Sequence, residues 1–431
     1  MLHTNLDVNE YGHLTFAGHD TVDLANTYGT PLMVLDEARI RENMRQYKAA
    51  MRDFFGGDSR PAFASKALSC KYIYRLAKEE GLAIDLVSSG ELYTALAAGF
   101  DVKNAFFHGN NKTDADIAYA LDNGVGTFVV DNLTELDRID EMAGERGLIP
   151  SVLLRLTPGI DPHTHAAVAT GKVDSKFGLA IETGQADKAV AYSLQKKHIA
   201  LRGFHCHIGS QIFELAPFRE AAKRMIAYVA HVKATFGMVT EILNLGGGFG
   251  VRYVDCQPIL DYRAFLSQMA EYVKKEVADG GLVMPTVIIE PGRSIVADAG
   301  LTLYSVGGTK EIPGFKNYVS VDGGMADNPR YALYQSEYTV CLASRMNDPA
   351  DYLCTVAGRC CESGDLLQEE VLLPKPKRDD VLAVLVTGAY NYSMASNYNR
   401  LPRPMMVAVR GEETVPVIRR ETLADLVSND L

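Results

Sequence analysis

Four short segments of the chain carry residue types that suit one kind of chemistry. Lys66 follows a short apolar run, and further along the sequence come His207–Ser210, Gly246–Gly248 and Glu290–Arg293. A lysine amine condenses with an aldehyde, an imidazole stacks on a flat ring, glycines let backbone amides approach a phosphate, and a carboxylate pairs with a protonated ring nitrogen. Such a set is what a pyridoxal 5'-phosphate site on a barrel requires.

Composition limits the class of protein. The 431 residues are enough for two domains. Acidic residues number 54 against 43 basic ones, and the net charge of -11 without a basic stripe argues against a nucleic-acid partner. We find neither a signal-like start nor an apolar run of membrane-spanning length, so we expect a soluble, cytoplasmic protein with no membrane partner. The seven cysteines lack metal-type spacing, which predicts reduced thiols and no metal site.

Eight runs of apolar or β-branched residues predict eight strands. They are Ala62–Ser65, Ile84–Val87, Ala105–His108, Thr127–Val130, Val152–Leu156, Gly203–His207, Ile242–Leu245 and Thr286–Glu290. Helical periodicity separates many of them, at Tyr72–Glu80, Glu91–Ala98, Asp114–Leu121, Leu133–Arg146 and Pro217–Phe236. This alternation predicts an α/β fold with a closed (β/α)8 TIM-like barrel over residues 33–294, because right-handed strand–helix units bury both faces of every strand.

The remaining sequence predicts a second, antiparallel β domain formed by residues 1–32 and 295–431. Strand-like runs with turn residues between them occur at Leu303–Gly308, Tyr318–Val321, Tyr338–Val340, Val381–Val386 and Met405–Val409. Leu14–Phe16 and Gly29–Leu35 indicate strands that precede the barrel, and we expect them to pack with this second domain. A short helix is expected at Thr422–Val427.

Polar residues gather at the predicted carboxyl ends of the barrel strands, where barrel enzymes place their chemistry. Besides the residues above, they are Asp85, Ser88, His108, Asn110, Asp131 and Arg155. Loops are polar in most proteins, and for Asp131 and Asn110 this plain explanation is as good as a functional one. It does not explain why Lys66, His207 and Glu290 form a chemically coherent set.

Five motifs together resemble those of diaminopimelate decarboxylases, which belong to the alanine racemase and ornithine decarboxylase fold group. They read FASKA at residues 63–67, HCHIGSQ at 205–211, LGGGFG at 245–250, EPGR at 290–293 and CESGD at 361–365. The similarity runs in unbroken order from about Tyr28 to Tyr390. The resemblance implies a pyridoxal phosphate-dependent carboxy-lyase that converts meso-2,6-diaminopimelate to L-lysine and CO2, the last step of lysine biosynthesis.

The resemblance also implies roles for single residues. Lys66 binds the cofactor aldehyde covalently, and His207 stacks on the cofactor ring with Asp85 orienting the imidazole. Glu290 pairs with the pyridine nitrogen, which makes the ring a strong electron sink and favours decarboxylation, whereas the racemases carry an arginine at this place. An alternative is an ordinary salt bridge between Glu290 and Arg293. The other implied cofactor contacts are Ser210, Gly246, Gly247, Gly248, Gly292, Arg293 and Tyr390.

Substrate choice is expected to depend on the second carboxylate of diaminopimelate and the ammonium beside it. By resemblance, Arg293 and Arg330 bind this carboxylate with Tyr334, while Glu362 binds the ammonium and Tyr390 also contacts the substrate. Buried arginines without a carboxylate partner are costly, so Arg330 argues against an ornithine decarboxylase. The plain alternative is that Arg330 pairs with Asp327.

Cys361 is the candidate proton donor, because a thiol with an ordinary pKa of about 8.5 is mostly protonated at neutral pH. The adjacent Cys360 is expected to be structural. The resemblance implies that Cys361 and Glu362 enter the active site of a partner subunit, which predicts a homodimer with shared sites. Two alternatives stay open: a decarboxylase of D-ornithine, D-lysine or a carboxylated polyamine, and a non-catalytic regulator on the same fold. Intact Lys66, Glu290 and Cys361 argue against the regulator.

Overall fold

The computed structural model describes residues 1–160 and 175–431, which divide into two compact units. Unit 1 comprises Met1–Glu42, Val251–Ile259 and Arg293–Leu431, and unit 2 comprises Asn43–Gly250 and Leu260–Gly292. The sequence predicts a barrel over residues 33–294, but residues 33–42, 251–259 and 293–294 belong to unit 1. One reason is that strand β4 (Leu32–Asp36) pairs with two other strands of the unit 1 sheet.

Unit 2 is a closed barrel of eight parallel strands, as the sequence predicts. The strands are β5 (Arg60–Ala64), β6 (Ala83–Leu86), β7 (Ala105–Phe107), β8 (Thr127–Val130), β9 (Ser151–Thr157), β11 (Ala200–His205), β12 (Ile242–Asn244) and β13 (Thr286–Ile289). β9 pairs with both β8 and β11, and β13 pairs with β5, which closes the ring. A short strand, β10 (Leu179–Ala180), pairs with β9. Every predicted barrel strand is therefore confirmed, with small shifts at its ends.

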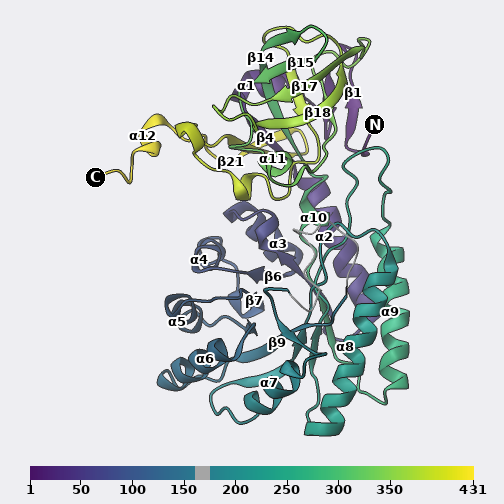
Figure 1. Ribbon diagram of the computed structural model, residues 1–431, viewed down its shortest axis with the longest axis vertical. Helices are drawn as coiled ribbons and strands as arrows, with labels where there is room; N and C mark the ends of the chain where they lie inside the picture. Colours follow the sequence, from purple (N-terminus) through teal and green to yellow (C-terminus); the bar gives the residue numbers. More distant parts are fainter. Residues whose placement is uncertain (161–174) are drawn as a thin grey trace. The chain divides into compact units, whose positions relative to one another are not determined.

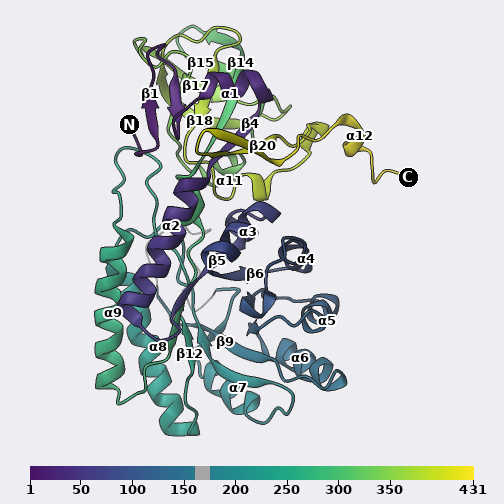
Figure 2. The same cartoon turned by 180° about the vertical axis from the view of Figure 1, so that it is seen from behind.

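Helices surround the barrel strands of unit 2 (Figures 1 and 2). They are α3 (Lys71–Glu80), α4 (Ser89–Ala97), α5 (Asp114–Asp122), α6 (Leu133–Glu145), α7 (Gln185–Ser193), α8 (Leu215–Phe236) and α9 (Tyr262–Asp279), preceded by α2 (Glu37–Ala50), which begins in unit 1. Ser88, Thr113 and Asn132 begin α4, α5 and α6, and each side chain accepts a hydrogen bond from a backbone N–H of the first turn. The helices α2, α7 and α9 were not predicted, although the buried positions of α9 recur three and four residues apart.

A buried core connects the barrel strands to one another. Its six residues are Ala62, Ala83, Phe106, Val129, Leu153 and Ile288. The small alanines of β5 and β6 leave room for the ring of Phe106 on the neighbouring β7. Burying one large apolar side chain stabilises a fold by roughly 1.5–3 kcal/mol. This packing holds the strands in register, and so it sets the spacing of the polar groups at their ends.

Unit 1 is built on a mixed sheet of mostly antiparallel pairs. Its strands are β4, β14 (Gly300–Ile312), β15 (Lys316–Val321), β16 (Val340–Cys341), β17 (Tyr352–Ala357), β18 (Leu366–Leu373), β19 (Val381–Val384), β20 (Met405–Arg410) and β21 (Glu413–Ile418). The pairs β15–β17 and β20–β4 are parallel, which the expectation of an antiparallel domain did not foresee. β4 lies between β14 and β20, so the expected packing of an N-terminal strand with this domain is confirmed.

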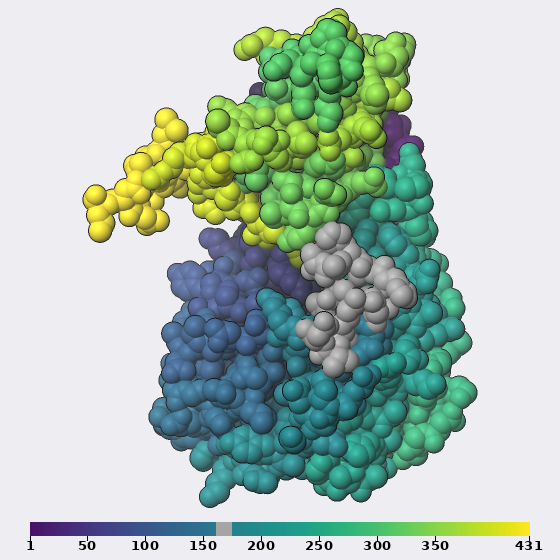
Figure 3. Space-filling view, in the orientation of Figure 1, coloured from purple at the N-terminus to yellow at the C-terminus, as the bar shows by residue number. Residues whose placement is uncertain are grey.

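Smaller elements complete unit 1. They are β1 (Leu6–Val8), β2 (Leu14–Phe16), β3 (His19–Asp20), α1 (Thr21–Tyr28), α10 (Arg293–Val296), α11 (Arg330–Tyr334) and α12 (Leu423–Leu426). The C-terminal segment after β21 projects from the rest of unit 1, in yellow in Figure 3. None of the helices in the described ranges combines the length and the apolar composition needed to cross a membrane.

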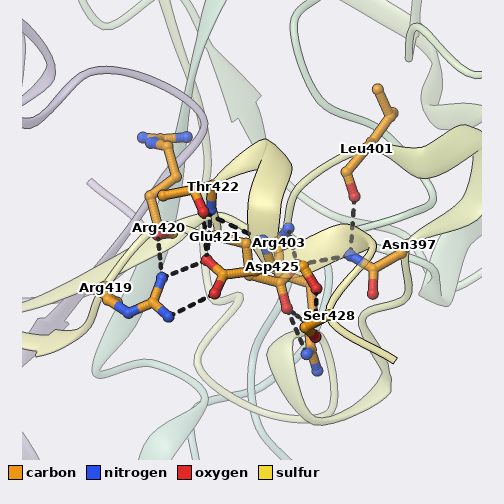
Figure 4. Close-up of polar contacts among 9 residues, drawn as sticks. All are labelled: Asn397, Leu401, Arg403, Arg419, Arg420, Glu421, Thr422, Asp425 and Ser428. Carbon is orange, nitrogen blue, oxygen red and sulfur yellow. Dashed lines mark hydrogen bonds and ion pairs between the residues drawn. The ribbon is translucent and has the colours of Figure 1, made fainter. Parts of the chain in front are cut away.

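Polar contacts give the C-terminal segment a defined conformation (Figure 4). Thr422 caps α12 with its hydroxyl, and Arg419 donates two hydrogen bonds to the carboxylate of Asp425 at 2.5 and 2.8 Å. Glu421 accepts hydrogen bonds from Arg403 Nε at 2.7 Å and Asn397 Nδ2 at 2.6 Å. The short helix expected near the C-terminus is thus confirmed, and its base is fixed to the turn before β20.

Candidate active site

Polar side chains from separate strands form one cluster in unit 2. Lys66 lies just after β5, Asp85 in β6, His108 just after β7 and Glu290 just after β13. Parallel strands bring their carboxyl ends to one rim of the barrel. Burial raises the pKa of Asp85 above its usual value, although the charges of His108 and Lys66 act in the opposite direction. The predicted strand-end residues are therefore close enough to influence one another electrostatically.

Glu290 is the centre of this cluster and is 6% exposed. Its Oε1 accepts a hydrogen bond from Asn244 Nδ2 at 2.7 Å and lies 2.8 Å from His108 Nε2, while its Oε2 lies 3.2 Å from His205 Nε2. The His108 ring is close, but it lacks the alignment of a hydrogen bond. Burial alone would raise the pKa of Glu290, yet His108 and His205 outweigh it and hold this pKa well below its usual range. Glu290 is thus a buried carboxylate that stays ionised at neutral pH.

His205 supports this ionised state as a neutral donor. Burial lowers its pKa to about 4, even though Glu290 acts in the opposite direction. A neutral imidazole with its proton on Nε2 can donate to the carboxylate without carrying a charge itself. His108, His205 and Glu290 also have the residue types and spacing of a metal site, with candidate ligand atoms within 4.8 Å of one another. Because Asn244 donates to Glu290 Oε1, we interpret the group as a carboxylate held by donors.

The loop after β11 carries His207, and its imidazole faces the glycine run. Nδ1 of His207 accepts a hydrogen bond from the N–H of Gly247 at 3.2 Å. Burial, with the charges of Lys66 and Arg155 nearby, lowers the pKa of His207 well below its usual value. The ring is therefore neutral at pH 7, as stacking on a flat cationic ring requires. The predicted orienting contact from Asp85 stays a prediction, since the partner found for Nδ1 is Gly247.

Side chains would not fit in the glycine loop. A Cβ at Gly247 would lie 2.0 Å from the carbonyl oxygen of Glu290, and one at Gly248 would lie 2.4 Å from that of Gly209, next to Ser210. Gly246 has a φ of 70°, which L-residues rarely adopt. Gly292 is similarly confined, because its Cβ would lie 2.8 Å from that of Ala64. The loops after β12 and β13 therefore approach their neighbours through backbone alone.

These features fit pyridoxal phosphate. Asp85 Oδ1 and His205 Nδ1 are buried polar atoms that have no hydrogen-bond partner within the described ranges. Unsatisfied buried atoms are rare unless a ligand or water completes them. The cluster adds an amine at Lys66, a neutral flat ring at His207, an ionised acid at Glu290 and a glycine cradle of the kind that admits phosphate oxygens.

A second group, which we call the arginine cluster, lies within unit 1. Arg293 is 7% exposed and Arg330 is 6% exposed. The guanidinium carbons of both lie over the ring of Tyr390, at 4.7 and 5.3 Å from its centroid, and Arg330 also lies 4.9 Å from the Tyr334 centroid. Arg293 NH1 donates to Tyr253 Oη at 2.8 Å. The predicted substrate residues Arg293, Arg330, Tyr334 and Tyr390 are therefore neighbours.

The plain alternative for Arg330, a pair with Asp327, is not supported. Asp327 accepts hydrogen bonds from the Tyr304 hydroxyl and the N–H of Gly324, and burial raises its pKa to about 7. Across the described ranges the Nε of Arg330 is buried without a hydrogen-bond partner, and its guanidinium lies over the rings of Tyr334 and Tyr390. A buried guanidinium that lacks an acidic partner suits an anionic ligand.

Hydrogen bonds to residues before and after it in the chain fix the loop that carries Cys361 and Glu362. Asp365 is buried and accepts hydrogen bonds from the N–H groups of Met325 and Cys360, and the N–H of Cys361 donates to Asn399 Oδ1 at 2.6 Å. Burial raises the pKa of the Cys360 thiol to about 11, which fits its expected structural role. Cys361 and Glu362 are exposed.

Sequence reasoning missed several residues of both groups. His205 was part of a quoted motif, but it received no role. In the predicted strand Gly203–His207 it stands two positions before His207, and alternate residues of a strand point to the same side. Asn244 is a polar residue at the end of an otherwise apolar strand, which is a usable signal. Tyr253 and Tyr338, whose ring centroids lie 5.2 Å apart beside Arg293, carried no signal in the sequence that would have identified them.

Comparisons with known proteins agree with this arrangement. The family described as "Pyridoxal-dependent decarboxylase, pyridoxal binding domain" matches residues 37–297. The diaminopimelate decarboxylase of Bacillus subtilis is 46% identical over 430 residues, covering 100% of this chain and 98% of the relative. That of Halalkalibacterium halodurans is 48% identical over 432 residues, with coverage of 100% and 98%. A crystal structure of diaminopimelate decarboxylase from M. jannaschii in complex with L-lysine superposes with a TM-score of 0.92 and 34% identity, covering 100% of this chain and 98% of that one.

Proposed function

The chain belongs to the diaminopimelate decarboxylase family of pyridoxal-dependent decarboxylases, and from this premise we propose how its residues release CO2 from meso-2,6-diaminopimelate to give L-lysine. One observation carries the proposal. Glu290 is a buried, ionised carboxylate held by Asn244 and His205 beside the strand-end lysine. A family member that only bound ligands would have no need to keep this charge buried at such a cost.

When bound, pyridoxal phosphate supplies a ring that takes up the electron pair left by the departing carboxylate. Glu290 keeps a proton on the ring nitrogen, because an ionised carboxylate stabilises the protonated form. Lys66 would bind the cofactor aldehyde, and the neutral ring of His207 would pack against the cofactor ring. Ser210 and the loop Gly246–Gly248 would hold the phosphate.

Substrate recognition is assigned to the arginine cluster. Arg330 is buried, its Nε has no hydrogen-bond partner within the described ranges, and a carboxylate ligand would satisfy it. Arg293, Tyr334 and Tyr390 line the same cluster. A diamine-forming decarboxylase would leave Arg330 unpaired, so this cluster favours a dicarboxylate substrate over ornithine or lysine. The M. jannaschii relative was solved with L-lysine, which is the product that decarboxylation of this dicarboxylate would give.

We assign the final proton transfer to Cys361, with Glu362 holding the distal ammonium. We further propose a cytoplasmic homodimer in which these two residues serve the site of the partner subunit. Support comes from the exposure of both side chains and from cysteines that are all free in this chain, as expected in a reducing compartment.

Product analysis tests the proposed reaction. The purified protein is incubated with pyridoxal phosphate and, in parallel, with meso-diaminopimelate, L-lysine or L-ornithine. We expect L-lysine and CO2 from the first substrate alone. Cadaverine or putrescine as the main product would instead establish a diamine-forming decarboxylase, and no product from any substrate would favour a regulator.

Reduction with borohydride tests the assignment of Lys66. The treatment should fix the cofactor covalently to the peptide that contains Lys66, as read by mass spectrometry. Lys71→Ala is the matched control, since it removes an exposed lysine at the start of α3 and should leave the label in place. An equal label on Lys66→Ala protein would show that another lysine binds the cofactor.

A further inference from the structure

Asn244 makes hydrogen bonds in two directions from a fully buried position. It is the last residue of β12 and has 0% exposed surface. Its Nδ2 donates to Glu290 Oε1 at 2.7 Å, and its Oδ1 accepts from the N–H of Gly246 at 2.9 Å. One side chain thus joins the ionised acid to the first residue of the glycine loop.

Two backbone hydrogen bonds lie beside this connection. The N–H of Glu290 donates to the carbonyl of Gly246 at 2.8 Å, and the N–H of Cys206 donates to the carbonyl of Asn244 at 2.9 Å. The planar amide has donors on one side and an acceptor on the other. A flipped amide would set its oxygen against a carboxylate oxygen and its NH2 against an N–H. The surroundings therefore determine a single orientation of Asn244.

We propose that Asn244 is a positioning residue that ties the Glu290 carboxylate to the glycine loop, so that the acid facing the cofactor ring and the loop facing its phosphate keep a fixed separation. The inference rests on the proposed function only in requiring that pyridoxal phosphate binds here. Neither half of the cofactor site could then shift without the other. A rigid connection of this kind preorganises a site before its ligand arrives.

Several other charged or titratable groups influence Glu290, and any pH measurement has to take them into account. They are His108 after β7, His205 in β11, Cys206 and His207 after β11, Asp85 in β6 and Arg155 in β9. His205 hydrogen-bonds to Glu290 and His207 accepts from Gly247, whereas Asn244 hydrogen-bonds both to Glu290 and to Gly246. The connection can therefore be tested by changing Asn244 alone.

Two substitutions separate the two halves of the connection. Asn244→Ala removes both hydrogen bonds. Asn244→Asp has the same shape and keeps an acceptor for Gly246 N–H, but it replaces the donor to Glu290 with a second acceptor. The matched control is Ser59→Ala, which removes a buried hydrogen bond that the N–H of Val287 donates to Ser59 Oγ at 3.0 Å. This bond lies at the N-terminal ends of β5 and β13, away from the strand ends that carry the cofactor site.

The experiment measures cofactor binding by the full-length protein after removal of its cofactor. Dissociation constants are determined for pyridoxal phosphate and for pyridoxal, which lacks the phosphate, and their ratio gives the gain due to phosphate. The visible band of the bound cofactor is then titrated with acid. Both readouts are independent of turnover, and a residue that only stabilised the fold would move neither.

We expect Asn244→Asp to keep the phosphate gain within about threefold of wild type, and Asn244→Ala to lose roughly tenfold or more of it. In both variants the acid titration of the band should move to higher pH by about one unit or more, because Glu290 has lost a donor. Ser59→Ala should match wild type in both readouts. If Asn244→Ala does not fold, the isosteric Asn244→Asp decides through its titration.

Unchanged titrations in both variants would overturn the inference, as would an Asn244→Asp protein that loses the phosphate gain as fully as Asn244→Ala. Either result would leave the proposed function intact. A wild-type protein that develops no band with pyridoxal phosphate would overturn the proposed function, and this inference with it.

Discussion

The guanidinium groups of Arg293 and Arg330 lie over the same aromatic ring, that of Tyr390, at 4.7 and 5.3 Å from its centroid. Two like charges brought together in a buried place repel each other unless an anion is shared between them. The electron-rich face of the tyrosine offsets only part of that repulsion. The arrangement is what a site for a carboxylate needs, and it makes Arg330 the sharpest place to test substrate choice.

We predict that Arg330→Met weakens binding of meso-diaminopimelate by about 2–5 kcal/mol, because one partner of a buried charge pair is lost. Arg330→Lys should rescue binding only in part, since an ammonium cannot make a two-pronged contact. Calorimetry on wild type and both variants measures the binding free energy of meso-diaminopimelate, with L-lysine as the comparison ligand. Arg419→Gln, in the exposed C-terminal segment, is the control. Equal losses for diaminopimelate and lysine would argue against a role at the distal carboxylate.

Glu290→Gln should bind pyridoxal phosphate yet lose roughly two or more orders of magnitude in kcat. The amide has nearly the shape of the carboxylate but cannot stabilise a proton on the ring nitrogen, and electrostatic terms of this kind amount to a few kcal/mol. Steady-state kinetics and cofactor titration on the same preparation separate the two effects. A variant with wild-type kcat would remove Glu290 from the mechanism.

His205 should make the cofactor-free protein sensitive to acid. Its pKa is lowered to about 4 in the folded state, whereas an unfolded histidine titrates near 6.5. Between these values the unfolded chain binds a proton that the folded chain does not, so the free energy of unfolding falls as the pH falls through this window. Above about pH 6.5 the residue contributes no slope, and the full loss is on the order of 3 kcal/mol.

Urea denaturation between pH 7 and pH 4 checks this expectation. His205→Gln, which keeps a donor but does not titrate, should show a flatter pH dependence than wild type. His231→Gln is the control, because His231 is an exposed histidine beside Asp187 at 3.0 Å. Identical slopes for wild type and His205→Gln would mean that the pKa of His205 is not lowered in the folded protein.

A shared active site predicts complementation between inactive subunits. Lys66→Ala and Cys361→Ala homodimers should each be severely impaired. In a mixed dimer one site would carry both defects and the other neither, so random reassociation of equal amounts should restore roughly a quarter of the wild-type sites. A tag on one variant verifies that mixed dimers form. Activity that stays at the sum of the parents in tagged mixed dimers would place both residues in one subunit's site.

Sequence by itself determined the barrel and the chemical types at its rim. Each barrel strand was visible because burial on both faces leaves a short continuous apolar run, and Lys66, His207 and Glu290 stand at the ends of such runs. The helical period of α9 was readable in the sequence as well, whereas the parallel pairs of unit 1 could not be read from strands that all look alike in sequence.

Only the tertiary structure determined which side chains contact one another in the site. Asn244 and His205 both hydrogen-bond to Glu290, although they precede it in the chain by 46 and 85 positions. No local pattern encodes a contact across that separation. The segment Val251–Ile259 leaves the barrel sequence to join unit 1, which brings Tyr253 to Arg293. Charge depends on these contacts as well, because burial pushes the pKa of a carboxylate upward and only the neighbours that the fold supplies keep Glu290 ionised.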